Sequence, residues 1–302
     1  MQRFFLVALF SFVAVMLVFW WLTGQEEQAV ISKVGSSESG IPMMEDHKFG
    51  GTELKGPADC KDVESRLAVF DVSYYDFEGV SQKGQIKVLG AVVDHVLSIF
   101  RDLYDLPFRI YKVDINDETG KGTRAYRCSN LSGKSARSIH SYGLAIDVNP
   151  QQNPSISVDL GKQAVVGVVP EGGIRNLNRL PKRPGKSDRM GLVVPEVVSV
   201  FAKHGFNHWG GYWDVPSIDY MRFEVSRPMA ILLVAMSTDD ASKFFDLHVD
   251  LCRMLPDERI TTGLAELMLQ RYFDGKMDGM IASYRMNRDG FFVMAEKLVA
   301  DH

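Results

Sequence analysis

The N-terminal segment constrains the fold more strongly than any other part of the chain. From Phe4 to Leu22 every residue is apolar except Ser11. A helix of this length can cross the ~30 Å hydrocarbon core of a bilayer, and it has no polar face that would suit a globular surface. The paired tryptophans at its end suit a membrane interface, and no small-x-small cleavage site follows them. We therefore predict a transmembrane signal anchor at residues 1–24, with a cleaved signal peptide as the alternative.

The charges around this segment predict on which side of the membrane the rest of the chain lies. Arg3 precedes the apolar run, and Glu26 and Glu27 follow it. Since basic residues favour the cytoplasmic side, the bulk of the chain is expected outside the cytoplasm. Residues 25–58 lack apolar periodicity and contain the run Gly-Ser-Ser-Glu-Ser-Gly, so we interpret them as a flexible linker.

Cysteines that lie outside the cytosol can form disulfides. The chain has three, Cys60, Cys128 and Cys252. Cys60 and Cys128 flank the first half of the region that follows the linker, so this is our preferred pair, although the sequence leaves the other pairings open. Their spacing does not resemble that of cysteines that bind a metal.

Composition argues for a globular chain and against some classes of partner. Hydrophobic residues make up 46% and charged residues 24% of the 302 residues, which is ordinary for a protein with a real core. The formal net charge of -4 provides no basic field, so we expect no nucleic-acid partner. Neither of the common glycine-rich phosphate-binding motifs is present, so nucleotide binding is not suggested.

Hydrophobic periodicity divides the rest of the chain into an α+β domain at residues 59–227 and a helical C-terminal extension at residues 228–302. The extension shows no chemistry and is a possible surface for a protein partner. In the domain the patterns predict strands at 67–75, 85–89, 108–113, 144–148 and 221–225, helices near 92–103 and 194–201, and a long loop at 117–138. In the extension they predict helices at 229–236, 239–254 and 264–273.

Two segments carry residues with catalytic or metal-binding chemistry. The first, Ser-Ile-His-Ser-Tyr-Gly-Leu-Ala-Ile-Asp at 138–147, combines His140 and Asp147, an imidazole and a carboxylate that suit zinc. Gly143 permits a tight approach between them. The second places Asp219 just before a predicted strand, where a carboxylate can act as a general base on metal-bound water. The spacing alone is weak evidence, because a His-x6-Asp pattern is common by coincidence.

The order of these motifs adds to that evidence. S-x-H-x-x-G-x-A-x-D at 138–147, W-G-G-x-W at 209–213 and D-x-x-R-F-E at 219–224 together resemble the M15 family of metallopeptidases. That family includes VanY-like D-Ala-D-Ala carboxypeptidases and L-alanyl-D-glutamate endopeptidases. The resemblance covers about residues 60–227. It implies a small antiparallel sheet flanked by helices (the M15 or hedgehog-like D,D-peptidase fold), peptidoglycan stem peptides as substrate, and a bacterial inner-membrane protein whose domain lies on the periplasmic side.

The resemblance also implies roles for individual residues. His140 and Asp147 would be two of three zinc ligands, and Asp219 would be the base that activates water. Arg127, with Arg124 as second choice, would stabilise the developing oxyanion. Candidates for substrate binding, some with core packing as the alternative, are Ser138, Tyr142, Trp209, Trp213, Arg222 and Glu224.

One position departs from the family pattern. Where the family has its third zinc-ligand histidine, this chain has Arg222, which has no lone pair to donate. A guanidinium near a metal is also repelled: two unit charges about 4 Å apart at an effective dielectric of about 20 repel by about 4 kcal/mol.

Three interpretations of Arg222 remain open. His208, or secondarily His204, completes the site; or Arg222 takes the place of the metal and pairs with Asp147 and Glu224; or zinc is weakly held, with a solvent ligand in the vacant position. The sequence thus supports a membrane-anchored zinc peptidase. The alternative is a non-catalytic wall-binding or scaffolding protein that lacks zinc.

Overall fold

The computed structural model describes residues 48–49, 52–53, 60–130, 137–180, 190–255 and 262–302. From Met44 to His302 the chain forms one compact unit of mixed α+β structure with small antiparallel sheets, as the patterns predicted. Within the described ranges no helix is both long enough and apolar enough to cross a bilayer. The predicted anchor at residues 1–24 lies outside those ranges and stays a prediction.

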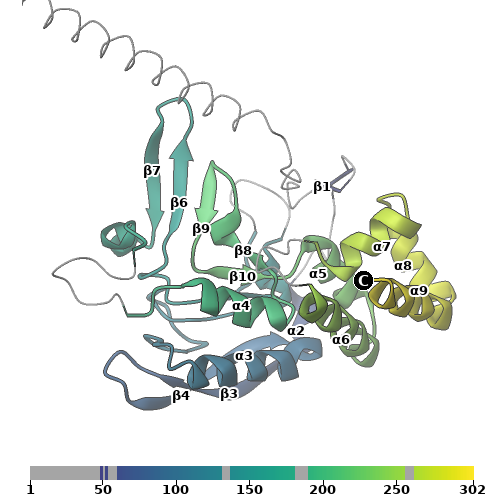
Figure 1. Ribbon diagram of the computed structural model, residues 1–302, viewed down its shortest axis with the longest axis horizontal. Helices are drawn as coiled ribbons and strands as arrows, with labels where there is room; N and C mark the ends of the chain where they lie inside the picture. Colours follow the sequence, from purple (N-terminus) through teal and green to yellow (C-terminus); the bar gives the residue numbers. More distant parts are fainter. Residues whose placement is uncertain (1–47, 50–51, 54–59, 131–136, 181–189, 256–261) are drawn as a thin grey trace, which may run out of the picture. The chain divides into compact units, whose positions relative to one another are not determined.

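The elements follow one another as labelled in Figure 1. The strands are β1 (Lys48–Phe49), β2 (Thr52–Glu53), β3 (Leu67–Tyr75), β4 (Ser81–Leu89), β5 (Ala145–Asp147), β6 (Ser155–Asp159), β7 (Ala164–Val169), β8 (His208–Trp209), β9 (Ser217–Asp219) and β10 (Arg222–Glu224). The α-helices are α2 (Lys61–Glu64), α3 (Val93–Asp105), α4 (Pro195–Lys203), α5 (Arg227–Ala235), α6 (Thr238–Met254), α7 (Leu264–Tyr272), α8 (Met277–Met286) and α9 (Arg288–Ala300). The 3-10 helices are η1 (Gly90–Val92), η2 (Ile139–Tyr142), η3 (Glu171–Asn176) and η4 (Gly210–Tyr212). The short pair β1–β2 falls inside the predicted linker.

The hairpin of β3 and β4 is the first layer of the domain. β3 has the predicted bounds, and β4 begins at Ser81, before the predicted start. The turn between them needs Gly79, whose φ of +85° is strained for any residue with a Cβ. Helix α3 lies along this hairpin (Figure 1), and its apolar stripe, including Ile99 and Phe100, is buried there.

Residues 108–113 do not form the predicted strand. They contribute only single bridges, from Arg109 to Tyr75 and from Val113 to Thr123. The side chain of Asn149 takes the place of a ladder partner: its Oδ1 accepts from Tyr111 N at 2.8 Å and its Nδ2 donates to Arg109 O at 2.8 Å. The alternation of apolar and polar residues therefore indicated an extended segment. It could not show that the backbone of this segment is hydrogen-bonded by a side chain and not by a neighbouring strand.

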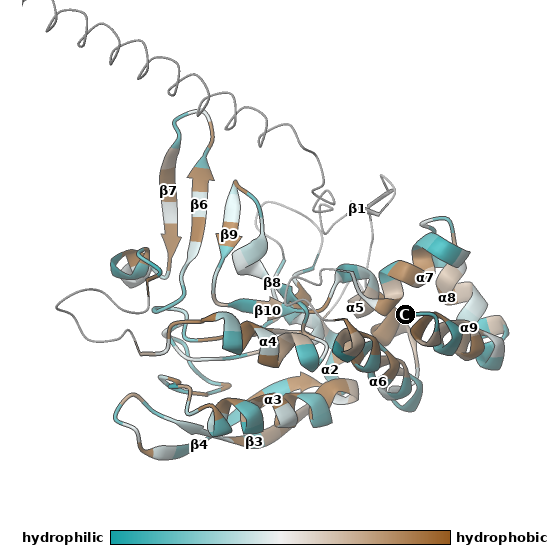
Figure 2. Cartoon of the chain, in the orientation of Figure 1, coloured by the Kyte–Doolittle hydropathy of each residue, from teal (hydrophilic) through white to brown (hydrophobic). Residues whose placement is uncertain are grey.

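The sequence patterns missed a hairpin of β6 and β7, which continues into β9 in the order β7-β6-β9. Figure 2 shows hydrophobic residues along β7, where Val165, Val166 and Val169 are exposed. A strand with apolar residues on open faces gives no alternation of buried and exposed positions, so periodicity could not find it. This sheet matters for the site because β9 ends at Asp219.

The C-terminal helices share one hydrophobic core with the rest of the described chain. α5, α6 and α7 lie where the sequence predicted helices, whereas α8 and α9 were not predicted. Buried methionines, among them Met268 and Met280, fill this core, while Met286 is exposed. His248 of α6 connects the domain to the C-terminal helices. Its Nε2 donates to Gly205 O in the domain at 3.0 Å, and its Nδ1 accepts from Leu264 N at the start of α7 at 3.3 Å.

His248 should make the fold sensitive to acid. Burial is the main cause that lowers the pKa of His248, from 6.5 to about 4. An unfolded chain binds this proton more tightly, so the contribution of neutral His248 is complete above pH 6.5 and declines as pH falls towards 4. The loss reaches about 3 kcal/mol at pH 4.

Urea unfolding of the wild type and of His248→Gln at a series of pH values measures this effect. The free energy of unfolding of the wild type should fall more steeply below pH 6.5 than that of the variant, which cannot titrate at this position. Parallel pH profiles for the two proteins would contradict the assignment.

Candidate active site

Local sequence explains how His140 and Asp147 come together. Ser138 caps η2 by accepting a hydrogen bond from His140 N at 3.4 Å. Gly143 ends η2 with a φ of +68°, and a Cβ there would lie 2.6 Å from Leu89 N. Leu89 N instead donates to Gly143 O at 3.1 Å, so the chain can turn tightly against β4 and enter β5. Gly143 was predicted to permit a tight approach between His140 and Asp147, and its own close contact is with β4.

The His140 and Asp147 side chains face each other in the interior, where they are 1% and 3% exposed. His140 Nδ1 donates to the carbonyl of Ala125, so this nitrogen carries a proton. His140 Nε2 lies 3.0 Å from Asp147 Oδ1. The ring orientation of His140 is therefore fixed by a backbone group, and Nε2 and Oδ1 face each other.

Arg222 lies beside the Asp147 side of this pair. β10 pairs with β5 in a register that puts Arg222 opposite Asp147. Arg222 Nε is 3.5 Å from Asp147 Oδ1, 3.5 Å from Asp219 Oδ2 and 3.9 Å from Glu224 Oε2. Trp213 covers the guanidinium, with its ring centre 5.8 Å from Arg222 Cζ. One cation thus sits among three carboxylates, with a side chain that is 15% exposed.

Three groups of this cluster, Arg222, Asp147 and Asp219, have shifted pKa values. Burial opposes ionisation of Arg222, yet Asp219, Asp147 and Glu224 outweigh it and raise the pKa of the guanidinium. Burial likewise opposes ionisation of Asp147, but His140 and Arg222 outweigh it and lower the pKa of this carboxyl. Asp219 differs, because burial dominates and raises its pKa to about 6. Its Oδ1 is buried and accepts no hydrogen bond from the described residues, which fits this shift.

Comparison with known proteins agrees with the motifs. Residues 132–225, which hold His140, Asp147, Asp219 and Arg222, match a family model of the M15 peptidases described as D-alanyl-D-alanine carboxypeptidase. This region of the chain is similar to the M15 peptidases. No curated protein and no solved structure matches the chain. At the coarse level, the match supports a peptidase-like function on peptidoglycan.

M15 peptidases are generally zinc enzymes, but the residues of this site do not fit a zinc ion. His140 Nε2 and Asp147 Oδ1 supply two donors, while the third position holds the guanidinium of Arg222. Zinc sites of this type need three protein ligands. Across the part of the chain that the structure describes, no group of three or more His, Cys, Asp or Glu side chains is arranged to hold a metal. The second of the three interpretations of Arg222 agrees best with this arrangement.

His208 does not complete the M15 site as predicted. It lies on the same sheet as Arg222, but its Nε2 is 3.5 Å from Glu266 Oε1 of helix α7. The physical reason is register: His208 stands opposite Glu224, whereas Asp147 stands opposite Arg222, two residues away on β10. His204 is also placed elsewhere, with Nε2 2.9 Å from Asp102 Oδ2.

The predicted substrate-binding residues divide into two groups. Ser138 and Tyr142 are buried, the first as a helix cap and the second within the hydrophobic core, so we correct both to structural roles. Trp209 donates from Nε1 to Tyr220 O at 3.0 Å and packs against the core. Trp213 and Arg222 form the partly exposed part of the M15 site.

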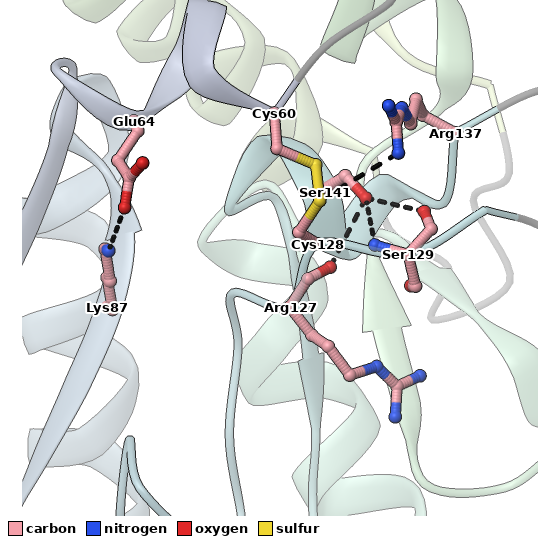
Figure 3. Close-up of a disulfide and its surroundings, with 8 residues drawn as sticks. All are labelled: Cys60, Glu64, Lys87, Arg127, Cys128, Ser129, Arg137 and Ser141. Carbon is pink, nitrogen blue, oxygen red and sulfur yellow. Dashed lines mark hydrogen bonds and ion pairs between the residues drawn. A yellow bond between two sulfur atoms is a disulfide. The ribbon is translucent and has the colours of Figure 1, made fainter.

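The segment that carries Arg127 is held against the site by a disulfide. Cys60 and Cys128 are bonded, as preferred from the sequence, and Cys252 is a buried free thiol. In Figure 3 the Arg127 side chain points away from the disulfide. Ser141 fixes the same segment by donating to Ser129 O at 2.7 Å.

Both candidate arginines lie close to the cluster, but they differ in their contacts. Arg127 N donates to His140 O at 3.2 Å, which places this residue beside the imidazole. The charge of its guanidinium acts on Asp147 and Asp219. Arg124 forms backbone hydrogen bonds with Asp147, while its Nη1 donates to Asp117 O at 3.4 Å in the preceding loop. Arg127 therefore remains the better candidate for a ligand contact.

Proposed function

We propose that this M15 domain binds peptidoglycan stem peptides that end in a free carboxylate and does not cut them. Arg222 serves as the fixed cation of the site in place of a zinc ion. The observation that carries the proposal is the position of the guanidinium, held between Asp147, Asp219 and Glu224 and facing the His140–Asp147 pair. The family match supports peptidoglycan as the source of the ligand.

The guanidinium has donors to spare for a ligand. Within the described residues its one hydrogen bond leaves from Nε, to Asp147 Oδ1 at 3.5 Å. The terminal NH2 groups form a planar fork that matches a carboxylate. Arg127 adds positive charge near Asp147 and Asp219, which favours an incoming anion.

A second candidate, a metal-assisted peptidase, is favoured by one observation. Asp219 has its pKa raised to about 6, chiefly by burial, which suits a general base near neutral pH. In this candidate a weakly held zinc would use His140 and Asp147. The binding proposal explains why position 222 is an arginine, whereas the peptidase candidate does not. We therefore give priority to the binding proposal.

We also propose that residues 1–24 anchor the chain in the bacterial inner membrane and that the domain lies on the periplasmic side. The apolar run and its flanking charges support this arrangement. Much of the region up to residue 58 would serve as a linker that lets the domain reach the wall. The C-terminal helices remain a possible surface for a protein partner.

A peptide-binding experiment tests the proposed function. The probe is diacetyl-L-Lys-D-Ala-D-Ala, with the same peptide carrying a C-terminal amide as the matched control, and the protein is the full chain. Calorimetry should show binding of the acid, and affinity for the amide should be lower by about tenfold or more, since the charge-assisted pair with Arg222 is lost.

Mass spectrometry of the same mixtures, supplied with micromolar zinc, separates the two candidates. We expect the peptide to remain intact. Cleavage that disappears in His140→Ala would establish the peptidase instead. Equal affinity for the acid and the amide would contradict the role of Arg222, and absence of binding to either would overturn the proposed function.

A further inference from the structure

A row of ionisable side chains crosses the sheet β5-β10-β8 on the face that carries Arg222. The register places Arg222 opposite Asp147 and Glu224 opposite His208. Residues two apart in a strand share a face, and cross-strand partners lie within about 5.5 Å of each other at Cβ. These four side chains therefore follow one another on one face, with acidic and basic groups in alternation.

Glu266 of helix α7 extends this row beyond the sheet. Its Oε1 lies 3.5 Å from His208 Nε2, and its Oε2 accepts from Gly263 N at 3.2 Å. The residue is 6% exposed. A carboxylate this buried is costly unless it is paired, so its contact with His208 is an energetically important link between helix and sheet.

Electrostatics agree with a strong link. Burial alone would raise the pKa of Glu266, but the hydrogen bond and charge of His208 outweigh it and the pKa is lowered. At the other end of the row, Arg222 Nε lies 3.9 Å from Glu224 Oε2. The start of α7 also packs closely on α6, because a Cβ on Gly263 would lie only 2.7 Å from His248 Cε1.

We propose that Glu266 is a positioning residue for the peptide-binding site. It holds His208 in place, His208 is the cross-strand neighbour of Glu224, and Glu224 helps to orient the guanidinium of Arg222. This inference rests on the proposed function of Arg222 as the ligand-binding cation. It makes the C-terminal helices part of the site, so that a partner bound to them can change the affinity for wall peptide through α7.

The test compares Glu266→Gln with Asp240→Asn in the full chain. Asp240 is the matched control because it too is a buried carboxylate of the C-terminal helices, but it pairs with Arg288 and Tyr284. The first readout is affinity for diacetyl-L-Lys-D-Ala-D-Ala. The second is the ¹H–¹⁵N resonance of the Arg222 Nε–H group, assigned by its loss in Arg222→Lys.

Glu266→Gln should weaken peptide binding by about fivefold or more, as for other coupled sites, and should shift the Arg222 resonance. Asp240→Asn should change neither, although it destabilises the helices. Should Glu266→Gln fail to fold, His208→Gln breaks the same link from the sheet side. An Arg222 resonance that stays unchanged in these variants, or one that shifts equally in Asp240→Asn, would overturn the inference. If the wild type binds no peptide, the proposed function fails, but the resonance still decides whether Glu266 positions Arg222.

Discussion

Replacing Arg222 with methionine should lower the free energy of unfolding by about 3–5 kcal/mol, the usual cost of removing one partner from a buried ion pair. Methionine has a similar length but no charge, so Asp147, Asp219 and Glu224 would remain buried together without their shared cation. Urea unfolding at pH 8 measures the loss.

Two comparisons make this result specific. Arg222→Lys keeps a positive charge and should lose less stability than the methionine variant. The loss in the methionine variant should also be smaller at pH 5 than at pH 8, because Asp219, whose pKa is about 6, then becomes protonated and one negative charge disappears. A methionine variant as stable as the wild type at pH 8 would show that the guanidinium does not balance the carboxylates.

Replacing Arg222 with histidine should create a zinc site. The change removes a positive charge and supplies an imidazole as the third ligand beside His140 Nε2 and Asp147 Oδ1, which already lie 3.0 Å apart. The Ala125 carbonyl already fixes the ring of His140. Zinc affinity should therefore increase by at least about 100-fold over the wild type, as competition with a chromophoric chelator can measure.

Arg222→Gln is the matched control for the histidine variant. It removes the positive charge without adding a metal ligand, so its zinc affinity should remain well below that of Arg222→His. Adding His140→Ala to the histidine variant should abolish the gain. If Arg222→His binds zinc no better than Arg222→Gln, position 222 does not face the His140–Asp147 pair.

Much of the site could be predicted because its geometry is local in sequence. His140 and Asp147 are separated by one turn and one strand, and Gly143 marks the tight turn between them. The resemblance to M15 peptidases then identified position 222 as the third corner of the site. The disulfide between Cys60 and Cys128 was also anticipated from compartment and position.

The rest depended on contacts between distant segments, which periodicity does not report. His208 was proposed as a ligand because it precedes Trp209, yet its partner Glu266 lies in a helix far along the chain. Glu266 itself carried no sequence signal, since an acidic residue in the first turn of an amphipathic helix is ordinary. Residues 108–113 likewise show the right alternation but are paired by the side chain of Asn149.

The sequence also left the role of Arg222 open among three interpretations, because only distances can decide between them. A side chain as long as arginine can point away from a metal or take its place. The distances from Arg222 to Asp147, Asp219 and Glu224 favour the second interpretation. In this interpretation the guanidinium of Arg222, which is covalently part of the chain, takes the place of the exchangeable zinc ion.

The zinc content of the wild-type full chain, measured after equilibration at micromolar free zinc and removal of unbound metal, tests this account most directly. The account predicts far less zinc than protein, and the same low content in His140→Ala. A stoichiometric amount of zinc in the wild type that is lost in His140→Ala would contradict it, because Arg222 would then have to leave the position in which it faces Asp147.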